Sequence, residues 1–319
     1  MGEGWGGGFR VSPPTRRRLE RLLPLLILTP SALAVGVFVY GFIAWTGYVS
    51  LSGWTTFVRD LSFAGLRAYR VLASDFRFQA DLRNVIVFMV LFVGISLAIG
   101  LALAIALDRQ PWGQGFFRNL FLFPMSIAFV VTGVVWQWLL NPSTGYNLIL
   151  RGLGWENPPR WYIDTTIWPG WDFLQIKLLV PLALLAVVVA AVWQMSGFAM
   201  AIFLAGLQGV PDELREAARV DGAAEWQLYR HVLLPLLFPL TATIVIVLGH
   251  ISLKTFDLVV AMTGPGSGFV TDVPGVYMFQ TTFRGNNFSR GAAIAVVMLV
   301  LVSALIVPYL ATQRRGARG

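Results

Sequence analysis

Six long, nearly uninterrupted apolar stretches decide what this chain of 319 residues can fold into. About 20 apolar residues in a helix cross a hydrocarbon core of about 30 Å, and each stretch is long enough to do so. We therefore expect an all-α membrane protein with six transmembrane helices. The stretches are Leu23–Leu51, Asn84–Leu107, Phe116–Leu140, Leu178–Gln208, Leu236–Met262 and Gly291–Ala311.

The composition agrees with a membrane protein and removes several other classes. Charged residues make up 13% of the chain, whereas a soluble domain has about 25%. A soluble enzyme, a nucleic-acid binder and a disordered tail are therefore excluded. The chain has no cysteine, which excludes disulfides, thiolate metal sites and a cysteine nucleophile.

The distribution of Lys and Arg predicts that both termini lie in the cytoplasm. In that orientation the inner segments hold 13 of these residues in 68 positions, and the outer segments hold 10 in 97, as the positive-inside rule requires. The first apolar run continues well past a signal-peptide-like Ala32-Leu33-Ala34, so we expect a retained helix. The inner segments are 1–22, 108–118, 209–235 and 312–319, and the outer ones are 52–83, 141–177 and 263–290.

The segment 206–239 is the only long, charged, helix-forming connection between two apolar stretches. Pro211 followed by two carboxylates favours a helix start, because proline suits the first helical position and acids suit the positive end of the helix dipole. Asp221-Gly222 predicts a turn, since glycine accepts the left-handed conformation that ends many helices. A second short helix is expected over Ala224–Val232, ending before Leu234-Pro235.

The exposed face predicted for the first of these helices has the features of a protein-docking surface. Ala217 and Ala218 are small enough for another protein to approach closely, and Glu216 beside them offers a charge. An amphipathic loop that rests on lipid headgroups would instead carry large apolar residues and lysines. The sequence therefore predicts a helix–turn–helix that lies parallel to the membrane and docks another protein.

The same residues resemble the EAA motif of permease subunits in bacterial binding-protein-dependent ABC importers, with Val232 where isoleucine is usual. In that family the segment is the coupling helix, which docks in a cleft of the cytoplasmic ATPase subunit and passes its motion to the membrane helices. The resemblance implies this coupling role for Glu216, Ala217, Ala218, Asp221, Gly222, Leu234 and Pro235.

The resemblance covers most of the chain and is strongest to permeases of glucose/mannose-type carbohydrate importers. Permeases for α-glucosides are close behind, and an oligosaccharide or polyol importer is the alternative. The stretches that carry it are Phe121–Asn147, Ile251–Gly266 and Thr281–Ala295. It implies the type I ABC importer permease fold in a bacterial inner membrane. The expected parts are a basic cytoplasmic tail over 1–22, a permease domain over 23–311 with the coupling segment 209–235, and a cytoplasmic tail over 312–319.

The resemblance also implies several partners. A second homologous permease, two copies of a cytoplasmic ABC ATPase and a periplasmic or lipid-anchored sugar-binding protein are expected. The sequence has no G-x-x-x-x-G-K-[ST] run to cradle phosphates. We therefore expect no cofactor in this chain, with ATP and Mg²⁺ bound by the partner ATPase.

Ionisable side chains inside the apolar stretches predict a polar path. Such groups cost about 2.5–3.5 kcal/mol at the bilayer centre and usually face a cavity or a partner. Lys254 and Asp257 are spaced i, i+3, which predicts one helix face and a mutual ion pair, with His250 one turn earlier. This face is either a self-satisfied pair or, with Phe256, the lining of a sugar path. Gln194 is a further path candidate, for which helix packing is the favoured interpretation.

An intramembrane enzyme is the alternative from another class. His250 and Ser252 are the residues that suggest it, but at i, i+2 they face different sides of a helix, whereas a hydrolase needs them in contact. There is no HExxH sequence, and the chain has two histidines. The sequence therefore favours a transport subunit over an enzyme.

Overall fold

The computed structural model describes residues 28–109, 113–173 and 176–316. In chain order its elements are η1 (Gly36–Gly41), α2 (Phe42–Ser50), α3 (Arg67–Ala73), α4 (Phe76–Asp108), α5 (Gln114–Leu122), η2 (Phe123–Ser126), α6 (Phe129–Leu139), α7 (Tyr146–Gly152), η3 (Trp161–Ile163), β1 (Ile167–Phe173) and β2 (Ile176–Pro181). They continue with α8 (Leu182–Gln208), α9 (Asp212–Val220), α10 (Glu225–Gln227), η4 (Leu228–Leu233), α11 (Leu234–Leu236), α12 (Phe238–Leu253), α13 (Asp257–Met262), η5 (Ser267–Phe269), α14 (Pro274–Phe279), η6 (Gln280–Arg284) and α15 (Phe288–Gly316).

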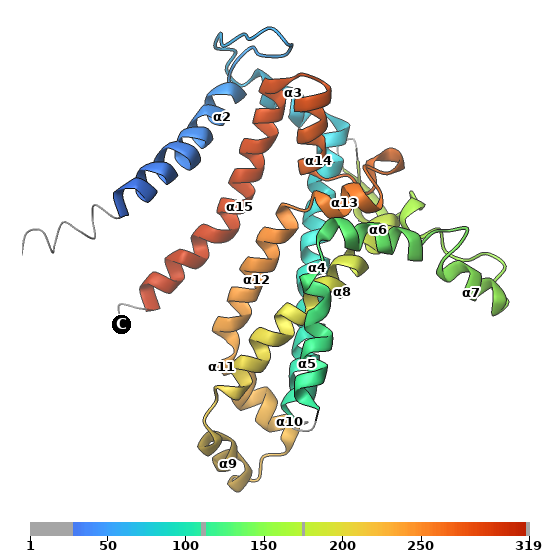
Figure 1. Cartoon of the computed structure of the whole chain (residues 1–319), viewed down its shortest axis with the longest axis vertical. Coiled ribbons are helices and arrows are strands. Elements are labelled where there is room, and N and C mark those ends of the chain that lie inside the picture. The colour runs from blue at the N-terminus through green and yellow to red at the C-terminus, as the bar shows by residue number, and fades with distance from the viewer. Residues whose placement is uncertain (1–27, 110–112, 174–175, 317–319) are drawn as a thin grey trace, which may run out of the picture.

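Long helices run from one end of the molecule, where α9 lies, to the opposite end, where α3 and α14 lie (Figure 1). Four described helices are long and apolar enough to cross a membrane, and the number rises to six if each of two bent pairs is one span. The prediction of a helical membrane protein is therefore confirmed. The four helices are Leu28–Ser50, Phe76–Asp108, Leu182–Gln208 and Phe288–Ala311. Residues 23–27 of the first predicted stretch lie outside the described residues.

The third apolar stretch, Phe116–Leu140, is not one straight helix. The segment Gln114–Ser126 and helix α6 meet at an angle of 97°. Pro124 lies in the tight turn η2, and Ile127 and Ala128 after it have extended backbone. Because extended residues cannot continue the i→i−4 ladder, the helix ends and α6 starts in a new direction.

The fifth apolar stretch, Leu236–Met262, is interrupted as well. Helix α12 ends at Leu253, Lys254 caps it, and a new short helix begins at Asp257. The polar side chains of Lys254 and Thr255 stand at this break rather than on the face of a continuous helix. Helix α13 packs against α6, so the short helices that follow the two interruptions lie against each other.

The core of the fold is the packing of α8 against α4, with α12 beside them. Large side chains of both helices are fully buried there, among them Phe88 and Phe92 of α4 and Met200 and Leu204 of α8. Gly197 of α8 lets the backbone of α5 approach, because a Cβ at this position would collide with the carbonyl oxygen of Phe121.

Gly197→Ala is therefore expected to destabilise the protein by about 1–3 kcal/mol, the usual cost of overpacking a filled interior. Gly94→Ala is the matched control, since a Cβ at Gly94 in α4 would have no neighbour within 4 Å among the described residues. The thermal midpoint of the purified protein in detergent measures both. A Gly197→Ala midpoint equal to that of Gly94→Ala would show that the close approach of α5 to Gly197 does not affect stability.

The fourth apolar stretch begins as a strand, not as a helix. Residues Ile176–Pro181 pair with β1 in an antiparallel hairpin, with Ile167 opposite Pro181 and Trp168 opposite Val180. Helix α8 starts directly after Pro181, which has the extended conformation of a helix-capping residue. The helix of the second predicted stretch, Asn84–Leu107, is longer than predicted. Helix α4 begins at Phe76, eight residues before Asn84, and ends at Asp108.

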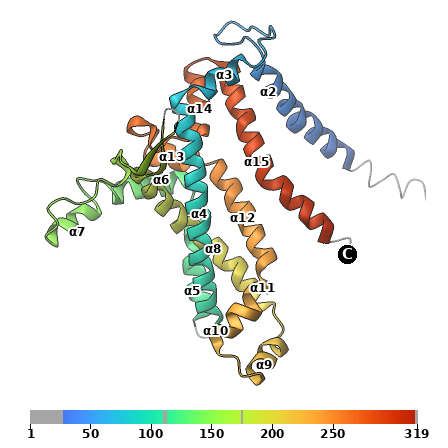
Figure 2. The ribbon, with the colours of Figure 1, turned by 180° about the vertical axis from the view of Figure 1, so that it is seen from behind.

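The first helix stands apart from this core. In both views α2 runs beside α15 and away from α4 and α8 (Figures 1 and 2), and its described contacts are mainly with α15. Most of its apolar side chains are exposed, including Phe38 and Phe42. Such a surface is expected for a helix whose surroundings are lipid or another subunit.

Candidate coupling segment and translocation path

Helix α9 projects from the end of the molecule (Figure 1). It starts after Pro211 and ends at Val220, and Gly222 then takes a left-handed backbone with φ of +81°. The predicted start and turn are therefore confirmed. Asp212 and Glu213 lie in the first turn, where carboxylates are favourable.

The predicted docking residues do not all lie on the free surface. Glu216, Ala217, Asp221 and Gly222 are exposed. Ala218 is half-buried and packs against the hydrophobic core, so the expectation of two exposed alanines is wrong. The cause is the 3.6-residue period, which turns neighbouring positions of one helix by about 100°.

The second helix of the segment is longer than predicted. It runs from Glu225 through Leu236 and includes the wide turn η4, so the expected end before Leu234-Pro235 is wrong. Pro235 lies in the first turn of α11, where a missing N–H is tolerated. Leu234 is half-buried against the core and Pro235 is exposed. The bend of 64° follows at Leu237, before α12.

A polar clamp fastens α9 to the ends of two long helices. The guanidinium of Arg215 donates to the carboxylate of Asp108, at 2.9 Å to Oδ2 and 3.4 Å to Oδ1. The same guanidinium donates to the carbonyl oxygen of Leu207 at 2.7 Å. The hydroxyl of Tyr229 donates to Asp108 Oδ2 at 2.9 Å. We call Asp108, Arg215 and Tyr229 the inner clamp.

The inner clamp is largely buried and joins four elements. The Arg215 and Asp108 side chains are 15% and 8% exposed. Asp108 ends α4, Leu207 lies in the last turn of α8, and Tyr229 belongs to η4. The Arg109 guanidinium lies 4.5 Å from the centre of the Tyr229 ring. A displacement of α9 therefore reaches α4 and α8 through directed, charge-assisted hydrogen bonds. Sequence reasoning did not find this clamp, although an acid at the very end of a long apolar stretch is a usable signal.

The break between α12 and α13 contains the predicted path residues. A cavity of about 170 Å³ is lined there by His250, Lys254, Phe256 and Asp257. Phe129 at the start of α6 also lines it. Lys254 and Asp257 are exposed, and the described residues show no ion pair between them. The predicted pairing on one helix face is wrong, because the helix ends between the two residues.

The other path candidate, Gln194, lies elsewhere. It is buried in α8 and its Nε2 donates to the carbonyl oxygen of Ile127 at 2.6 Å. That carbonyl is one of the groups that the bend before α6 leaves without a helical partner. The favoured interpretation of Gln194 as a packing residue agrees with this contact.

The two residues that suggested an enzyme are not in contact. The hydroxyl of Ser252 donates to the carbonyl oxygen of Gly249 at 2.7 Å. His250 lines the cavity, and its Nδ1 is buried without a hydrogen-bond partner among the described residues. The arrangement supplies no histidine base for the serine, as the i, i+2 spacing predicted.

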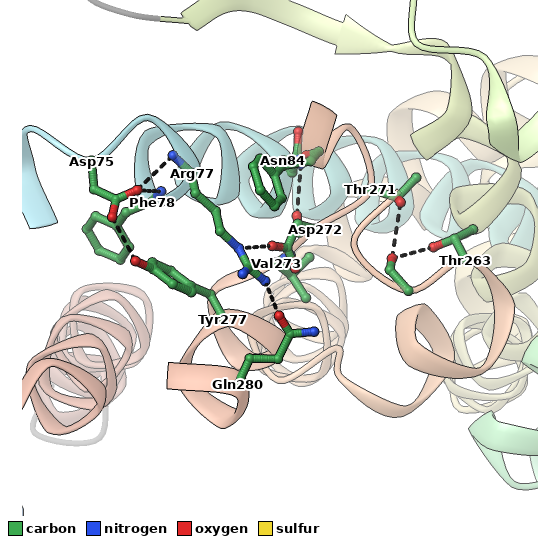
Figure 3. Close-up of polar contacts among 12 residues, drawn as sticks. Asp75, Arg77, Phe78, Asn84, Thr263, Thr271, Asp272, Val273, Tyr277 and Gln280 are labelled. Carbon is green, nitrogen blue, oxygen red and sulfur yellow. Dashed lines mark hydrogen bonds and ion pairs between the residues drawn. The ribbon is translucent and has the colours of Figure 1, made fainter. Parts of the chain in front are cut away.

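A second polar network closes the opposite end of the fold (Figure 3). Arg77 near the start of α4 donates through Nε to Asp272 Oδ2 at 2.6 Å and through Nη2 to Gln280 Oε1 at 2.8 Å. Its guanidinium also lies 4.4 Å from the centre of the Tyr277 ring. The Tyr277 hydroxyl donates to Asp75, which caps α4. We call Asp75, Arg77, Asp272, Tyr277 and Gln280 the outer network.

Asn84 and Arg83 of α4 make further hydrogen bonds next to the outer network. Asn84 Nδ2 donates to the carbonyl oxygens of Phe269 and Asp272, both at 2.8 Å. Arg83 donates to Asn84 Oδ1 and to the carbonyl oxygen of Lys177 in β2. The N-terminal part of α4 is thus tied to the loop before α14 and to the hairpin.

The comparisons with known proteins identify the family. Residues 94–315 match the family described as binding-protein-dependent transport system inner membrane component. This chain belongs to that family. It is a multi-pass inner-membrane permease without an ATPase site of its own, and ATP hydrolysis is the task of separate subunits.

Individual relatives of this permease match at least four fifths of it. A probable ABC transporter permease protein of Pyrococcus horikoshii is 35% identical over 92% of this chain and 96% of its own length. The xylose/arabinose import permease protein XacH of Haloferax volcanii is 34% identical over 80% of this chain and 76% of its own. A chain in the crystal structure of a bacterial ABC transporter for the acidic polysaccharide alginate has a TM-score of 0.77 at 19% identity, over 94% and 98% of the two chains. This likeness establishes the type I ABC importer permease fold.

Proposed function

We propose that this permease is one of two membrane subunits of an ATP-driven carbohydrate importer. The observation that carries the proposal is helix α9, which projects from the bundle with Glu216 exposed and is fastened to α4 and α8 by the inner clamp. A helix presented in this way can seat in another protein and move with it. The coupling residues are Glu216, Ala217, Ala218, Asp221, Gly222, Leu234 and Pro235, with Ala218 and Leu234 holding the segment to the core.

The mechanism that follows is alternating access. Two ATPase subunits close around ATP and carry α9 with them, and the inner clamp passes that motion to α4 and α8. The membrane cavity then opens outward to receive a sugar from a binding protein, and hydrolysis returns it to the inward-open state. A second homologous permease supplies the other half of the path, because the charges at the α12–α13 break are exposed in this chain and are costly against lipid.

The substrate is a neutral sugar, with glucose or mannose as the first candidate. Support for glucose or mannose comes from the sequence resemblance to glucose/mannose-type permeases, and the two pentoses named for XacH support a sugar in general. The alternative is an α-glucoside, another oligosaccharide or a polyol. Lys254, Asp257 and His250 offer donors and acceptors for sugar hydroxyls around the cavity, and Phe256 offers an aromatic face.

Co-purification tests this assignment. The tagged permease, extracted from its native membrane in mild detergent, is expected to bring an ABC ATPase and a second permease in fixed ratio. Thermal-shift assays of the associated binding protein against a panel of sugars then identify the substrate. Isolation of the chain free of any ATPase, under conditions that keep other importers assembled, would argue against the proposal.

Asp257→Asn is expected to lower sugar uptake about tenfold, because a charged acceptor contributes roughly 1.5–3 kcal/mol to a hydrogen bond. Asp257 makes no ion pair among the described residues, so assembly should be unaffected. Uptake into proteoliposomes and the yield of intact complex measure the two effects. Asp60→Asn, at an exposed position in the first outer loop, is the control. Equal uptake by Asp257→Asn and Asp60→Asn would show that Asp257 does not contribute to the sugar path.

A further inference from the structure

A small polar pocket lies at the outer end of the fold, away from both the inner clamp and the α12–α13 break. It has a volume of about 110 Å³ and is formed by the loop after α2, helix α3 and the start of α15. Its polar lining residues are Ser52, Thr55, Arg67, Asn287, Ser289 and Arg290. We call it the outer pocket.

The charge of the outer pocket favours an anion. Arg67 and Arg290 are among its lining residues, and none of the described lining residues is an acid. The Arg290 side chain is also within hydrogen-bonding reach of the Tyr277 hydroxyl, and the Asp60 carboxylate lies close to the lining residue Gly53. Arg67 is exposed, and it has no ion-pair partner in the described part of the chain. Arginine presents a planar fork of donors that matches the oxygens of a phosphate group.

The walls of the outer pocket are firmly held. Ser52 and Ser289 are buried, at 4% and 3% exposure. The Ser289 amide donates to the carbonyl oxygen of Trp54 at 2.8 Å, and the Trp54 ring stacks on Phe288 at 4.6 Å between centres. The hydroxyl of Ser52 donates to the carbonyl oxygen of Val49 at 2.7 Å. These bonds hold the two serines in place and use the hydrogens of the Ser52 hydroxyl and the Ser289 amide, so a ligand here would depend on the two arginines.

The depth of the outer pocket suits a headgroup. It lies where α15 begins, and the apolar run of that helix starts at Gly291, directly after the pocket residue Arg290. Lipid phosphates lie at the boundary between hydrocarbon and water, where an arginine can pair with them. Arginines here also account for part of the positive charge that the outer segments carry.

We propose that the outer pocket binds a phosphate group through Arg67 and Arg290, supplied by a phospholipid headgroup or by free phosphate. The bound group would connect the first outer loop and α3 to the start of α15. This role is separate from coupling and from the sugar path, so it stands or falls independently of the proposed function.

Ligand-induced stabilisation of the purified, delipidated full chain tests the proposal. The probes are dihexanoyl phosphatidylglycerol, inorganic phosphate and a dihexanoyl glycerol without phosphate. Thermal shifts and native mass spectrometry report binding. We expect saturable binding of at least one phosphate probe and none of the phosphate-free glycerolipid. Binding of the lipid alone assigns the phosphate to a headgroup, and binding of inorganic phosphate alone assigns it to a free anion.

Two variants separate specific binding from general attraction to a basic surface. Arg67→Gln should weaken binding about tenfold, the order expected for a lost charge-assisted hydrogen bond. Arg70→Gln, at another exposed arginine of α3 that does not line the pocket, should leave it unchanged. Ala64→Leu keeps both arginines but fills the pocket, and should weaken binding at least as much as Arg67→Gln. Equal affinities in Arg67→Gln and Arg70→Gln, or no binding of either phosphate probe, would overturn the proposal.

Discussion

Replacing Arg215 by methionine is expected to leave α9 in place as a helix but to separate ATP hydrolysis from sugar uptake. The variant keeps the apolar stem of the side chain and removes the contacts to Asp108 and Leu207. Removing one partner of a buried ion pair costs about 3–5 kcal/mol, because the other charge stays buried. We therefore expect uptake to fall more than tenfold while the partner ATPase still turns over.

Transport and hydrolysis measured in the same proteoliposomes give this result directly. Arg219→Met is the matched control on the same helix, since Arg219 pairs with Glu225 at the surface, with 57% and 52% of the side chains exposed. Such exposed pairs contribute about 0–1 kcal/mol. If Arg215→Met and Arg219→Met had the same ratio of uptake to hydrolysis, the inner clamp would have no part in coupling. A double-mutant cycle with Asp108→Asn measures the strength of the pair itself.

Arg77→Met is expected to produce the largest loss of stability among single changes at the outer end. Asp272 is fully buried, and Arg77 is the cation that contacts its carboxylate. Without Arg77, Asp272 and Gln280 both lose a donor, and the aromatic contact with Tyr277 is lost as well. We expect a loss of about 3–5 kcal/mol in the free energy of unfolding.

The thermal midpoint of the complex in detergent measures this loss, with Arg70→Met at an exposed site of α3 as the control. Asp81 provides an internal check. It is fully buried beside this network, and its carboxyl group lies within hydrogen-bonding reach of the Asp272 carboxyl, where an amide in its place can donate. Adding Asp81→Asn to Arg77→Met should therefore recover part of the loss. A midpoint for Arg77→Met within error of the control would show that the outer network does not stabilise the fold.

The spans were predictable because apolar length is a local property of the sequence. The bend before α6 was not, since Ile127 and Ala128 are ordinary residues and the nearest signal is Pro124 upstream. At Lys254 the polar interruption was visible, but i, i+3 spacing implies a shared face only while the helix continues. Its end depends on the packing of α13 against α6.

The coupling motif was predictable for a different reason, because its residues are close together in the sequence and match a family pattern. The inner clamp joins residues 107 positions apart, and Arg77 and Asp272 are 195 positions apart. No periodicity connects such pairs, and each charge alone indicates only a polar end of a helix. The partners in these long-range ion pairs therefore could not be predicted from the sequence and became visible only in the folded structure.

Glu216→Lys tests most directly whether a separate ATPase drives this permease through α9. Glu216 is exposed and makes no ion pair among the described residues, so the reversed charge should affect docking and not folding. The measurement is ATP-dependent sugar uptake into proteoliposomes that hold the complete importer, with Glu213→Lys in the first turn of α9 as the control. We expect normal membrane insertion, retained uptake in the control and loss of uptake in Glu216→Lys. Unchanged uptake in Glu216→Lys would show that the ATPase does not act through α9.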